Sequence, residues 1–400
     1  MTKAQNSFLS LDRQFSSLPK EVKFCRNCVV SNQRPRTRFT EEGICSACLW
    51  AYEKDHVVDW KKRGLELEAL LEKHRSADGS FDCVVPGSGG KDSAFVAHQL
   101  KTRWGMHPLC VTWTPFEYTE IGYQNLQNFI NSGFTNLLGQ PDGLVHRKLA
   151  RLAFELKGDA WEPFSYGQKS WAFQVALRFG LKLIFYGENG ELEYGGQEKF
   201  KNMPKQGPED WVVEQFKGAT VDEIAETGLK RGVLKESEAG RALNWYKAPP
   251  TEEIVTRGVE GHWYSYYQKW TPQENFYYAV RHCGFECNDE GRSEGTYNKY
   301  VSLDDKADGF HWYLSYMKFG MCRASRDAQQ DIRRHHLTRE EGVRLVQRYD
   351  GEFPKKHFKW FLEYLDITEE FFWEVMDKYR ELSNVWEKVD GQWVLKHVVE

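Results

Sequence analysis

Short apolar runs alternate with longer periodic stretches between residues 81 and 186. Mainly apolar runs at 81–85, 108–113 and 181–186 predict three buried strands. Apolar residues recur at helical spacing in four intervening stretches, at 93–103, 121–130, 143–156 and 170–179. Short apolar strands that alternate with helices predict a parallel sheet covered by helices on both faces.

The first predicted strand leads into a glycine-rich loop at residues 86–93, which reads Pro-Gly-Ser-Gly-Gly-Lys-Asp-Ser. Backbone amides at a helix N-terminus bind anions, and glycines allow the backbone to approach an oxyanion closely. Ser88 and Ser93 add hydroxyl donors, and Lys91 adds a positive charge. The loop is not a Walker A motif, because Asp92 follows the lysine. We therefore predict a phosphate-binding loop of another kind.

Ligands of such parallel sheets bind beyond the carboxyl ends of the strands. The second predicted strand ends near Trp113, and the third stops at the segment Gly187-Glu188-Asn189. We therefore expect the glycine-rich loop, Trp113 and residues 187–189 to surround one crevice. The segment 187–189 could equally be an ordinary turn, because Gly and Asn are common turn residues.

Changes in sequence character divide the chain into three regions. Residues 49–75 predict a helix that bends near Gly64, and a polar break follows at 76–80. After about residue 219, helical patterns and aromatic runs replace the alternation of strands and helices. We expect an N-terminal region at 1–76, an α/β domain with a parallel, Rossmann-like sheet at 77–218, and a mainly helical region at 219–400.

Four cysteines near the N-terminus have the spacing of a zinc ribbon. Cys25 and Cys28 form one C-x2-C pair, and Cys45 and Cys48 form a second, with sixteen residues between the pairs. Four thiolates fill the tetrahedral shell of Zn²⁺ and leave no open position for a reacting water. We therefore predict a structural Zn²⁺ site. The remaining cysteines carry no assignment, and Cys283 and Cys287 with their neighbour His282 fall short of a closed metal site.

Composition restricts the partners. The formal net charge of −4 gives no overall positive field, which disfavours a nucleic-acid partner. Aromatic residues reach 15% of the chain and supply large apolar surfaces for a core or for a ligand. The sequence shows neither a secretory signal pattern nor an apolar stretch of about 18 residues. We expect a cytoplasmic location, no membrane span, and a small charged substrate.

A basic segment occurs late in the chain. Its members are Lys318, Arg323, Arg326, Arg333 and Arg334. Guanidinium groups bind phosphate and carboxylate through paired hydrogen bonds, whereas a helix surface laced with ion pairs gives the same composition. We favour a binding role for Lys318 and Arg323, and a surface role for Arg334.

Two of these features have a recognisable family pattern. The string Ser88-Gly89-Gly90-Lys91-Asp92-Ser93 resembles the S-G-G-x-D-S signature of the PP-loop ATP pyrophosphatases. The chain as a whole more specifically resembles the N-acetyl sugar amidotransferases of bacterial surface-polysaccharide biosynthesis. The segments that carry this closer resemblance are 25–48, the glycine-rich loop, 187–189 and 318–327.

The resemblance implies roles for individual residues. The β and γ phosphates of ATP would be held by Ser88, Gly89, Gly90 and Ser93. The adenine would lie against the backbone of Val111, Thr112 and Trp113. The α-phosphate or its Mg²⁺ would lie near Gly187, Glu188 and Asn189. Asp92 would orient the loop or help to hold Mg²⁺, and charge on the departing group would be stabilised by Lys91, Lys318 and Arg323.

The implied reaction is an ATP-dependent, AMP-forming amidine synthesis. The acetamido oxygen of a diacetamido sugar, sugar nucleotide or sugar acid would be adenylylated, and ammonia would then displace AMP. The product would enter lipopolysaccharide O-antigen or a related glycan. The sequence lacks a Gly-x-Cys-x-Gly glutaminase elbow, and its nearest string, 320–324, ends in Ala. The resemblance therefore implies a separate glutaminase subunit and a cyclase-like ammonia-channel subunit, akin to those of imidazole glycerol phosphate synthase.

Two alternatives remain open on the sequence. A PP-loop sulfurtransferase that thiolates tRNA would need a persulfide-carrying cysteine near the crevice, for which Cys322 is the candidate, because Cys83 and Cys110 lie within apolar strands. A zinc-ribbon scaffold with a degenerate nucleotide site is disfavoured by the intact loop. The sequence identifies neither the sugar, nor its nucleotide carrier, nor the oligomeric state.

Overall fold

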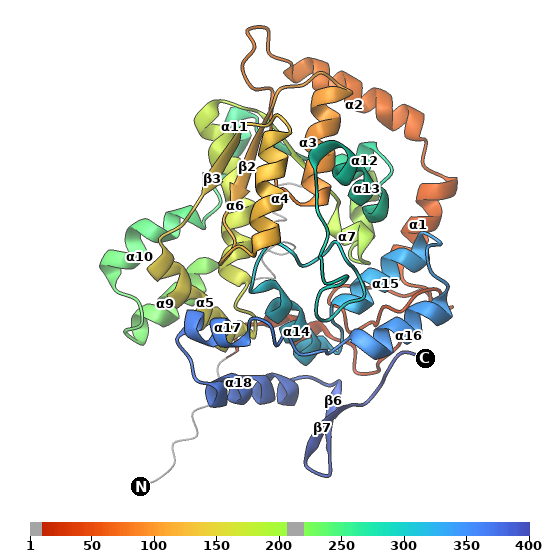
Figure 1. Cartoon of the computed structure of the whole chain (residues 1–400), viewed down its shortest axis with the longest axis vertical. Coiled ribbons are helices and arrows are strands. Elements are labelled where there is room, and N and C mark those ends of the chain that lie inside the picture. The colour runs from red at the N-terminus through yellow and green to blue at the C-terminus, as the bar shows by residue number, and fades with distance from the viewer. Residues whose placement is uncertain (1–9, 206–219) are drawn as a thin grey trace.

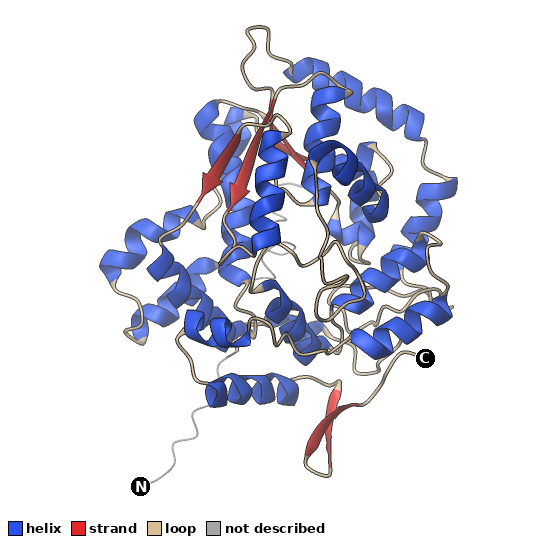
Figure 2. Ribbon diagram, viewed as in Figure 1, coloured by secondary structure: helices blue, strands red, loops and turns tan. Residues whose placement is uncertain are grey.

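A five-stranded parallel sheet forms the centre of the molecule. The computed structural model describes residues 10–205 and 220–400. The strands lie in the order β3-β2-β1-β4-β5, and every neighbouring pair is parallel. They are β1 (Cys83–Pro86), β2 (Pro108–Trp113), β3 (Asn136–Gly139), β4 (Leu183–Tyr186) and β5 (Glu260–Trp263). Helices surround this sheet in Figures 1 and 2.

Side chains that alternate along the strands build two separate cores. Val84, Leu109 and Ile184 belong to one apolar cluster, and Val85, Cys110 and Phe185 belong to another. Helices α5 (Gly143–Lys157) and α6 (Glu162–Phe179) pack on the first face. Helices α3 (Lys91–Thr102), α4 (Glu120–Asn131) and α13 (Pro272–Cys283) cover the second. The predicted three-layer arrangement of a parallel sheet between helices is confirmed.

Further helices flank this α/β unit. Before the sheet come α1 (Ser46–His56) and α2 (Trp60–His74). Short elements follow β4, and they are α7 (Gly190–Glu193), the 3-10 helix η2 (Glu198–Asn202), α9 (Val221–Lys230), α10 (Glu236–Ala242), η3 (Leu243–Trp245), α11 (Thr251–Arg257) and α12 (Tyr264–Tyr267). The C-terminal region contains α14 (Asp308–Phe319), α15 (Arg323–Arg333), α16 (Arg339–Tyr349), α17 (Phe358–Leu365) and α18 (Glu369–Leu382). A hairpin of β6 (Trp386–Val389) and β7 (Gln392–Leu395) follows, and η1 (Arg13–Ser17) lies near the N-terminus.

The predicted bend at Gly64 is wrong. The chain breaks instead at residues 57–59, between α1 and α2, and Gly64 lies inside α2. The Asp59 side chain caps the new helix by accepting a hydrogen bond from the Lys62 amide at 2.9 Å. A side-chain cap satisfies an otherwise unpaired amide at a helix start, which outweighs the modest cost of one interior glycine.

The hydrophobic pattern of the sequence did not predict two of the five strands of this sheet. β3 and β5 are four residues long, and neither forms a continuous apolar run. β5 lies beyond residue 219 and pairs with β4, with Ile184 opposite Gly261. The sheet therefore draws its edge strand from the region expected to be helical. The three domain limits remain a prediction.

The N-terminal cysteine segment packs against the C-terminal helices. Cys25, Val29 and Cys45 share an apolar cluster with Ala328 of α15 and Val343 of α16. Figure 1 shows α15 and α16 close to α1 at one side of the molecule. No helix within residues 10–205 and 220–400 combines the length and the apolar character that a membrane crossing needs.

Candidate functional site

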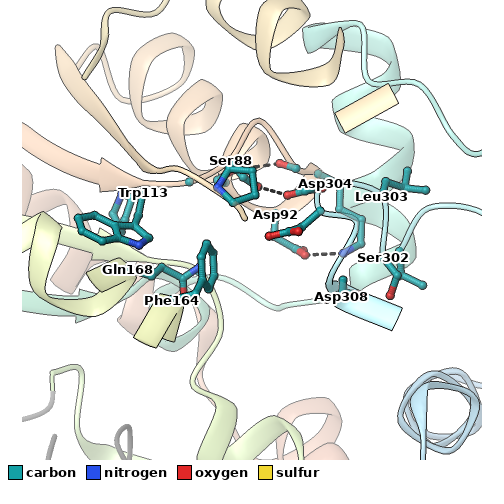
Figure 3. A pocket seen from close by; sticks show the side chains of 18 of the residues that line it. Ser88, Asp92, Trp113, Phe164, Gln168, Ser302, Leu303, Asp304 and Asp308 are labelled. Carbon is teal, nitrogen blue, oxygen red and sulfur yellow. Dashed lines mark hydrogen bonds and ion pairs between the residues drawn. The ribbon is translucent and has the colours of Figure 1, made fainter. Parts of the chain in front are cut away.

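A cavity of about 390 Å³ opens at the carboxyl ends of β1, β2 and β4. Its lining includes the glycine-rich loop, Trp113 and Glu188, as the strand-end argument predicts, and also residues 300–305. Figure 3 shows Trp113, Phe164 and Gln168 at one end, Asp304 and Asp308 at the other, and Ser88 and Asp92 between them. The sheet therefore brings together an apolar end and a polar end in one cavity.

Close packing explains two glycines of the loop. Gly89 has φ +82°, and a Cβ there would lie 2.6 Å from the Leu126 Cα. A Cβ at Gly87 would lie 2.1 Å from the Ser93 Cβ. A side chain is thus excluded at Gly89 by both backbone conformation and space, and at Gly87 by space. Gly90 is the N-cap of α3, which begins at Lys91, so the amides of this helix start face the cavity region.

The polar side chains of the loop have partners within the protein. The Ser88 hydroxyl donates to the Asp304 carboxylate, and the Lys91 ammonium contacts Asp92. Asp92 also accepts a hydrogen bond from the Asn275 amide at 3.0 Å. The Ser93 hydroxyl donates to the Gly90 carbonyl at 3.0 Å. These contacts tie the loop to Asp304, to Asn275 and to its own backbone.

The other residues predicted to bind nucleotide divide into two groups. Val111, Trp113, Gly187 and Glu188 line the cavity with Ser88, Gly90, Lys91, Asp92 and Ser93. Gly89, Thr112 and Asn189 lie behind this lining. The buried Thr112 hydroxyl donates to the Gly87 carbonyl at 2.6 Å, and the Asn189 side chain accepts from the Glu191 amide at 3.0 Å. The Thr112 side chain therefore positions the loop, and the Asn189 side chain positions the start of α7.

The two cations from the basic segment lie in different places. Arg323, at the start of α15, lines the main cavity and pairs with Asp327 at 3.3 Å. Lys318 is buried, and its ammonium lies 2.7 Å from the Asp12 carboxylate and 3.0 Å from the Lys157 carbonyl. Its side chain lies against a second cavity. Arg334 is also largely buried, near Glu193 at 3.4 Å, so its predicted surface position is wrong.

Three aspartates of the cavity were missed in the sequence. Asp304 and Asp305 line it from the segment before α14, and Asp308 lines it from the first position of that helix. The Asp305 carboxylate is occupied by backbone groups, because it accepts hydrogen bonds from the Phe116 amide at 2.6 Å and the Ala307 amide at 2.8 Å. One Asp308 carboxylate oxygen is buried and lacks a hydrogen-bond donor among the described residues. The acidic string 304–308 was the only signal, and acidic strings are common on surfaces.

Burial disfavours charge on two carboxyl groups of the cavity. It raises the pKa of Glu188, with a further contribution from the nearby Asp92 carboxylate and opposition from Arg326. Burial also raises the pKa of Asp304, against the hydrogen bond from Ser88. Carboxyl groups that resist ionisation in a cavity become better ligands when a cation enters, because the cation supplies the missing charge compensation.

The apolar end of the cavity is built from aromatic rings. Trp113 packs on α6, where a Cβ at Gly167 would lie 2.1 Å from its indole ring. Its indole N–H is buried and has no acceptor in the described part of the chain. Trp171 lies 6.4 Å from Trp113 between ring centroids. A flat ring with an unpaired donor beside it suits a planar, hydrogen-bonding ligand.

The four N-terminal cysteines form a candidate metal centre. All four are buried, and the Sγ atoms of Cys25, Cys28, Cys45 and Cys48 lie within 4.8 Å of one another. The Cys25–Cys48 and Cys28–Cys45 sulfur distances are 3.8 Å and 3.7 Å. The Arg333 guanidinium lies 3.9 Å from the Cys28 sulfur. Four converging thiols fit a structural metal such as Zn²⁺.

Comparisons with known proteins match parts of the chain. Residues 294–399 match the family described as "LPS biosynthesis protein WbpG-like, C-terminal domain". A further similarity is to an uncharacterized protein of Methanocaldococcus jannaschii, MJ1599, with 30% identity over 88 residues. That alignment covers 22% of this chain and 31% of the relative, so the chain spans about a third of the relative's length. The matched segment 294–399 includes Asp304, Asp308 and Arg323 of the main cavity.

Proposed function

We propose that this protein is an ATP-dependent, AMP-forming N-acetyl sugar amidotransferase. Its substrate is a diacetamido sugar, sugar nucleotide or sugar acid, and its product carries an acetamidino group for lipopolysaccharide or a related glycan. One observation carries the proposal. The cavity joins the glycine-rich loop to Asp304, Asp308 and Arg323, which belong to the segment that matches a lipopolysaccharide biosynthesis family.

The loop suits a pyrophosphate leaving group. Its glycines admit close approach of an oxyanion, and the amides at the start of α3 supply donors. Lys91 and Arg323 line the same cavity and bring two positive charges. The aromatic end near Trp113 would take the adenine, in agreement with the position of β2 beside the loop. ATP would then lie with its α-phosphate between these ends.

The acidic end suits Mg²⁺. Hard divalent cations prefer oxygen ligands, and Asp92, Glu188, Asp304 and Asp308 all line the cavity. A bound Mg²⁺ would neutralise charge on the phosphates. The protein's own part is to hold these carboxylates ready, through the contacts of Asp304 with Ser88 and of Asp92 with Asn275. Without a cation, three or four carboxylates would repel a triphosphate.

The reaction proceeds in two balanced steps. The acetamido oxygen attacks the α-phosphorus, the bond to the β-phosphate breaks, and pyrophosphate leaves while the amide nitrogen loses its proton. Ammonia then adds to the activated carbon, and the carbon–oxygen bond breaks to release AMP and the amidine. Preorganised donors that face the departing pyrophosphate lower the barrier of the first step. The ammonia comes from a separate glutaminase subunit through a cyclase-like channel subunit.

The test combines the purified chain with ATP, Mg²⁺, ammonium and candidate diacetamido sugars. We expect AMP and pyrophosphate to form only when a sugar is present, with a product in which NH replaces one acetamido oxygen. Free ammonium substitutes for the partner subunits in this assay. Formation of ADP, or AMP release that never depends on a sugar, would contradict the proposal.

Thiolation of tRNA is the competing function. It requires a cysteine that reaches the activated carbon, and all nine cysteines lie within the described residues. The cavity lining contains no cysteine, and Cys322 is buried against the second cavity. Burial raises the pKa of the Cys322 thiol, which opposes thiolate formation. A turnover that needs tRNA and is abolished in Cys322→Ser would favour the sulfurtransferase.

A further inference from the structure

A second cavity, of about 190 Å³, lies between the cysteine ribbon, α14 and α15. Arg34 and Arg36 line it from the ribbon, and Arg326 lines it from α15. Tyr194 and Trp312 form its aromatic walls, and Ser315 adds a hydroxyl. Three cationic side chains from segments almost 300 residues apart therefore converge on one small cavity.

Some charges of this cavity are already compensated. Arg36 pairs with Glu191 at 2.7 Å, Lys318 with Asp12 at 2.7 Å, and the His311 ring with Asp159 at 3.0 Å. Arg34 and Arg326 differ. In residues 10–205 and 220–400, neither has a carboxylate oxygen within the 4.0 Å of an ion pair, and the Arg34 guanidinium makes one long contact, with Thr37 at 3.4 Å. These two guanidinium groups of the cavity thus lack an ion-pair partner within the described residues. Against the effect of burial, the Tyr194 hydroxyl and the charge of Glu188 stabilise the charged form of Arg326 and raise its pKa.

Both guanidinium groups lie against the same ring. The Cζ of Arg326 lies 3.9 Å from the centre of Tyr194, and the Cζ of Arg34 lies 5.9 Å from it. The pKa of Arg34 is lowered to about 10, chiefly by burial, with a further contribution from the charges of Arg36 and Arg326 and opposition from Glu191. Buried cations with this mutual repulsion gain stability when an anion comes between them.

The second cavity adjoins the main one. The Tyr194 hydroxyl donates to the Glu188 carboxylate at 3.4 Å, and Glu188 lines the main cavity. On the other side, the Trp312 ring lies 4.7 Å from the Cζ of Arg323 and 4.9 Å from that of Arg326. A ligand whose reactive end lies near Glu188 and Arg323 would thus have its other end beside Tyr194 and Trp312.

We propose that the second cavity binds the anionic group of the sugar substrate, a phosphate or a carboxylate, through Arg34 and Arg326. This inference rests on the proposed function, since it assigns the anionic end of the same substrate. Guanidinium groups recognise either oxyanion through paired hydrogen bonds, so the two sources share one chemistry. The cavity thereby selects anionic diacetamido sugars over neutral ones.

The test compares wild type with Arg34→Gln and Arg326→Gln, each of which keeps a polar side chain and removes the charge. Arg344→Gln, on the exposed surface of α16, is the matched control. The substrates are a UDP-linked diacetamido sugar, a diacetamido sugar acid and a neutral diacetamido sugar. We expect KM for the anionic substrate to rise about ten- to a hundredfold in both variants, with kcat and the KM for ATP little changed.

Two comparisons make the result decisive. The anionic sugar that wild type prefers identifies the group as phosphate or carboxylate, and Arg326→Lys should restore part of the affinity if Arg326→Gln remains folded by circular dichroism. Unchanged KM values, or equal losses for anionic and neutral sugars, overturn the inference. If wild type turns over none of these sugars, the proposed function fails. In that case, calorimetry with the same sugars tests whether the second cavity binds the anionic group. Binding that is lost in Arg34→Gln and Arg326→Gln and kept in Arg344→Gln supports the inference, and any other result overturns it.

Discussion

The Ser88 hydroxyl donates a hydrogen bond to the Asp304 carboxylate, across 216 residues of sequence. The contact links the glycine-rich loop to the segment before α14 (Figure 3). It places an acidic group beside a loop suited to phosphates, where a bare carboxylate would repel the ligand. The two sides are compatible when a divalent cation lies between them, so Asp304 becomes the first residue to test.

Asp304→Asn should weaken the response to Mg²⁺. The amide keeps the size of the side chain and loses the charge that a cation needs. We expect the Mg²⁺ concentration for half-maximal AMP formation to rise about tenfold or more. Asp289→Asn, at an exposed position, is the control. An unchanged Mg²⁺ titration in Asp304→Asn would remove this residue from the cation site.

Gly89→Ala should destabilise the loop more than a simple backbone effect explains. Both Gly89 and Gly79 have positive φ, at +82° and +80°, but only at Gly89 would a Cβ meet backbone atoms, at 2.6 Å. We expect Gly79→Ala to cost about 1 kcal/mol of unfolding free energy, and Gly89→Ala more than about 2 kcal/mol. Urea titration measures both. Equal losses would show that space at Leu126 does not matter.

Lys318 and Arg323 should separate into a structural and a functional residue. Lys318 is buried with Asp12, so Lys318→Ala removes the positive charge that pairs with this buried carboxylate and should cost about 3–5 kcal/mol. Arg323 lines the main cavity, so Arg323→Gln should lower kcat/KM at least tenfold with a smaller loss of stability. Urea titration and AMP assays on both variants check this. A stable, inactive Lys318→Ala would reverse the assignment.

Asp350 gives the protein a pH-dependent stability. Its carboxyl accepts from the Cys322 amide at 3.1 Å and the Ser325 amide at 2.9 Å, which fixes the start of α15 beside Arg323. Burial raises the pKa of Asp350 to about 6 against these hydrogen bonds. In unfolded chains the pKa of an aspartate is about 3.9. Between about pH 4 and 6, Asp350 therefore holds a proton in the folded protein that it has lost in the unfolded chain. This proton binding stabilises the folded state, and the stabilisation falls as pH rises through that window.

Asp350→Asn should remove that part of the pH dependence. An amide does not titrate, so the difference between wild type and variant should change by roughly 2–3 kcal/mol between pH 4 and 6 and stay constant above pH 7. Urea titrations across this range measure the slope, which is independent of any fixed loss from the altered hydrogen bonds. Parallel pH profiles for the two proteins would place the folded pKa of Asp350 near its ordinary value.

Loss of one ribbon cysteine should release the metal. Four buried thiols form the candidate site, and their segment packs on α15 and α16. Wild type should contain about one Zn²⁺ per chain, and Cys28→Ser should contain much less and melt at a lower temperature. Cys287→Ser, outside the cluster, should keep its metal. Metal analysis and thermal melting give the answer, and full zinc content in Cys28→Ser would count against tetrahedral binding by all four cysteines.

The sequence by itself determined the features that depend on neighbouring residues. The apolar runs at 108–113 and 181–186 identified strands, because a strand buried on both faces needs continuous apolar residues. The C-x2-C pairs identified the cluster of four cysteines, which could hold a metal ion, since two short turns bring four thiols together. The rule for ligand position at parallel strand ends then predicted that the loop, Trp113 and Glu188 line one cavity.

Only the tertiary structure decided which distant residues complete that cavity. β5 joined the sheet through pairing with β4, because backbone hydrogen bonds at a sheet edge accept a strand of almost any composition. Asp304 contacts the loop and Asp308 lines the same cavity, whereas the Lys318 ammonium is held outside that cavity by its ion pair with Asp12. Arg34 and Arg326 met at Tyr194 from opposite ends of the chain. The local pattern of apolar and polar residues does not predict such contacts between distant residues, because they depend on how the helices pack over the sheet.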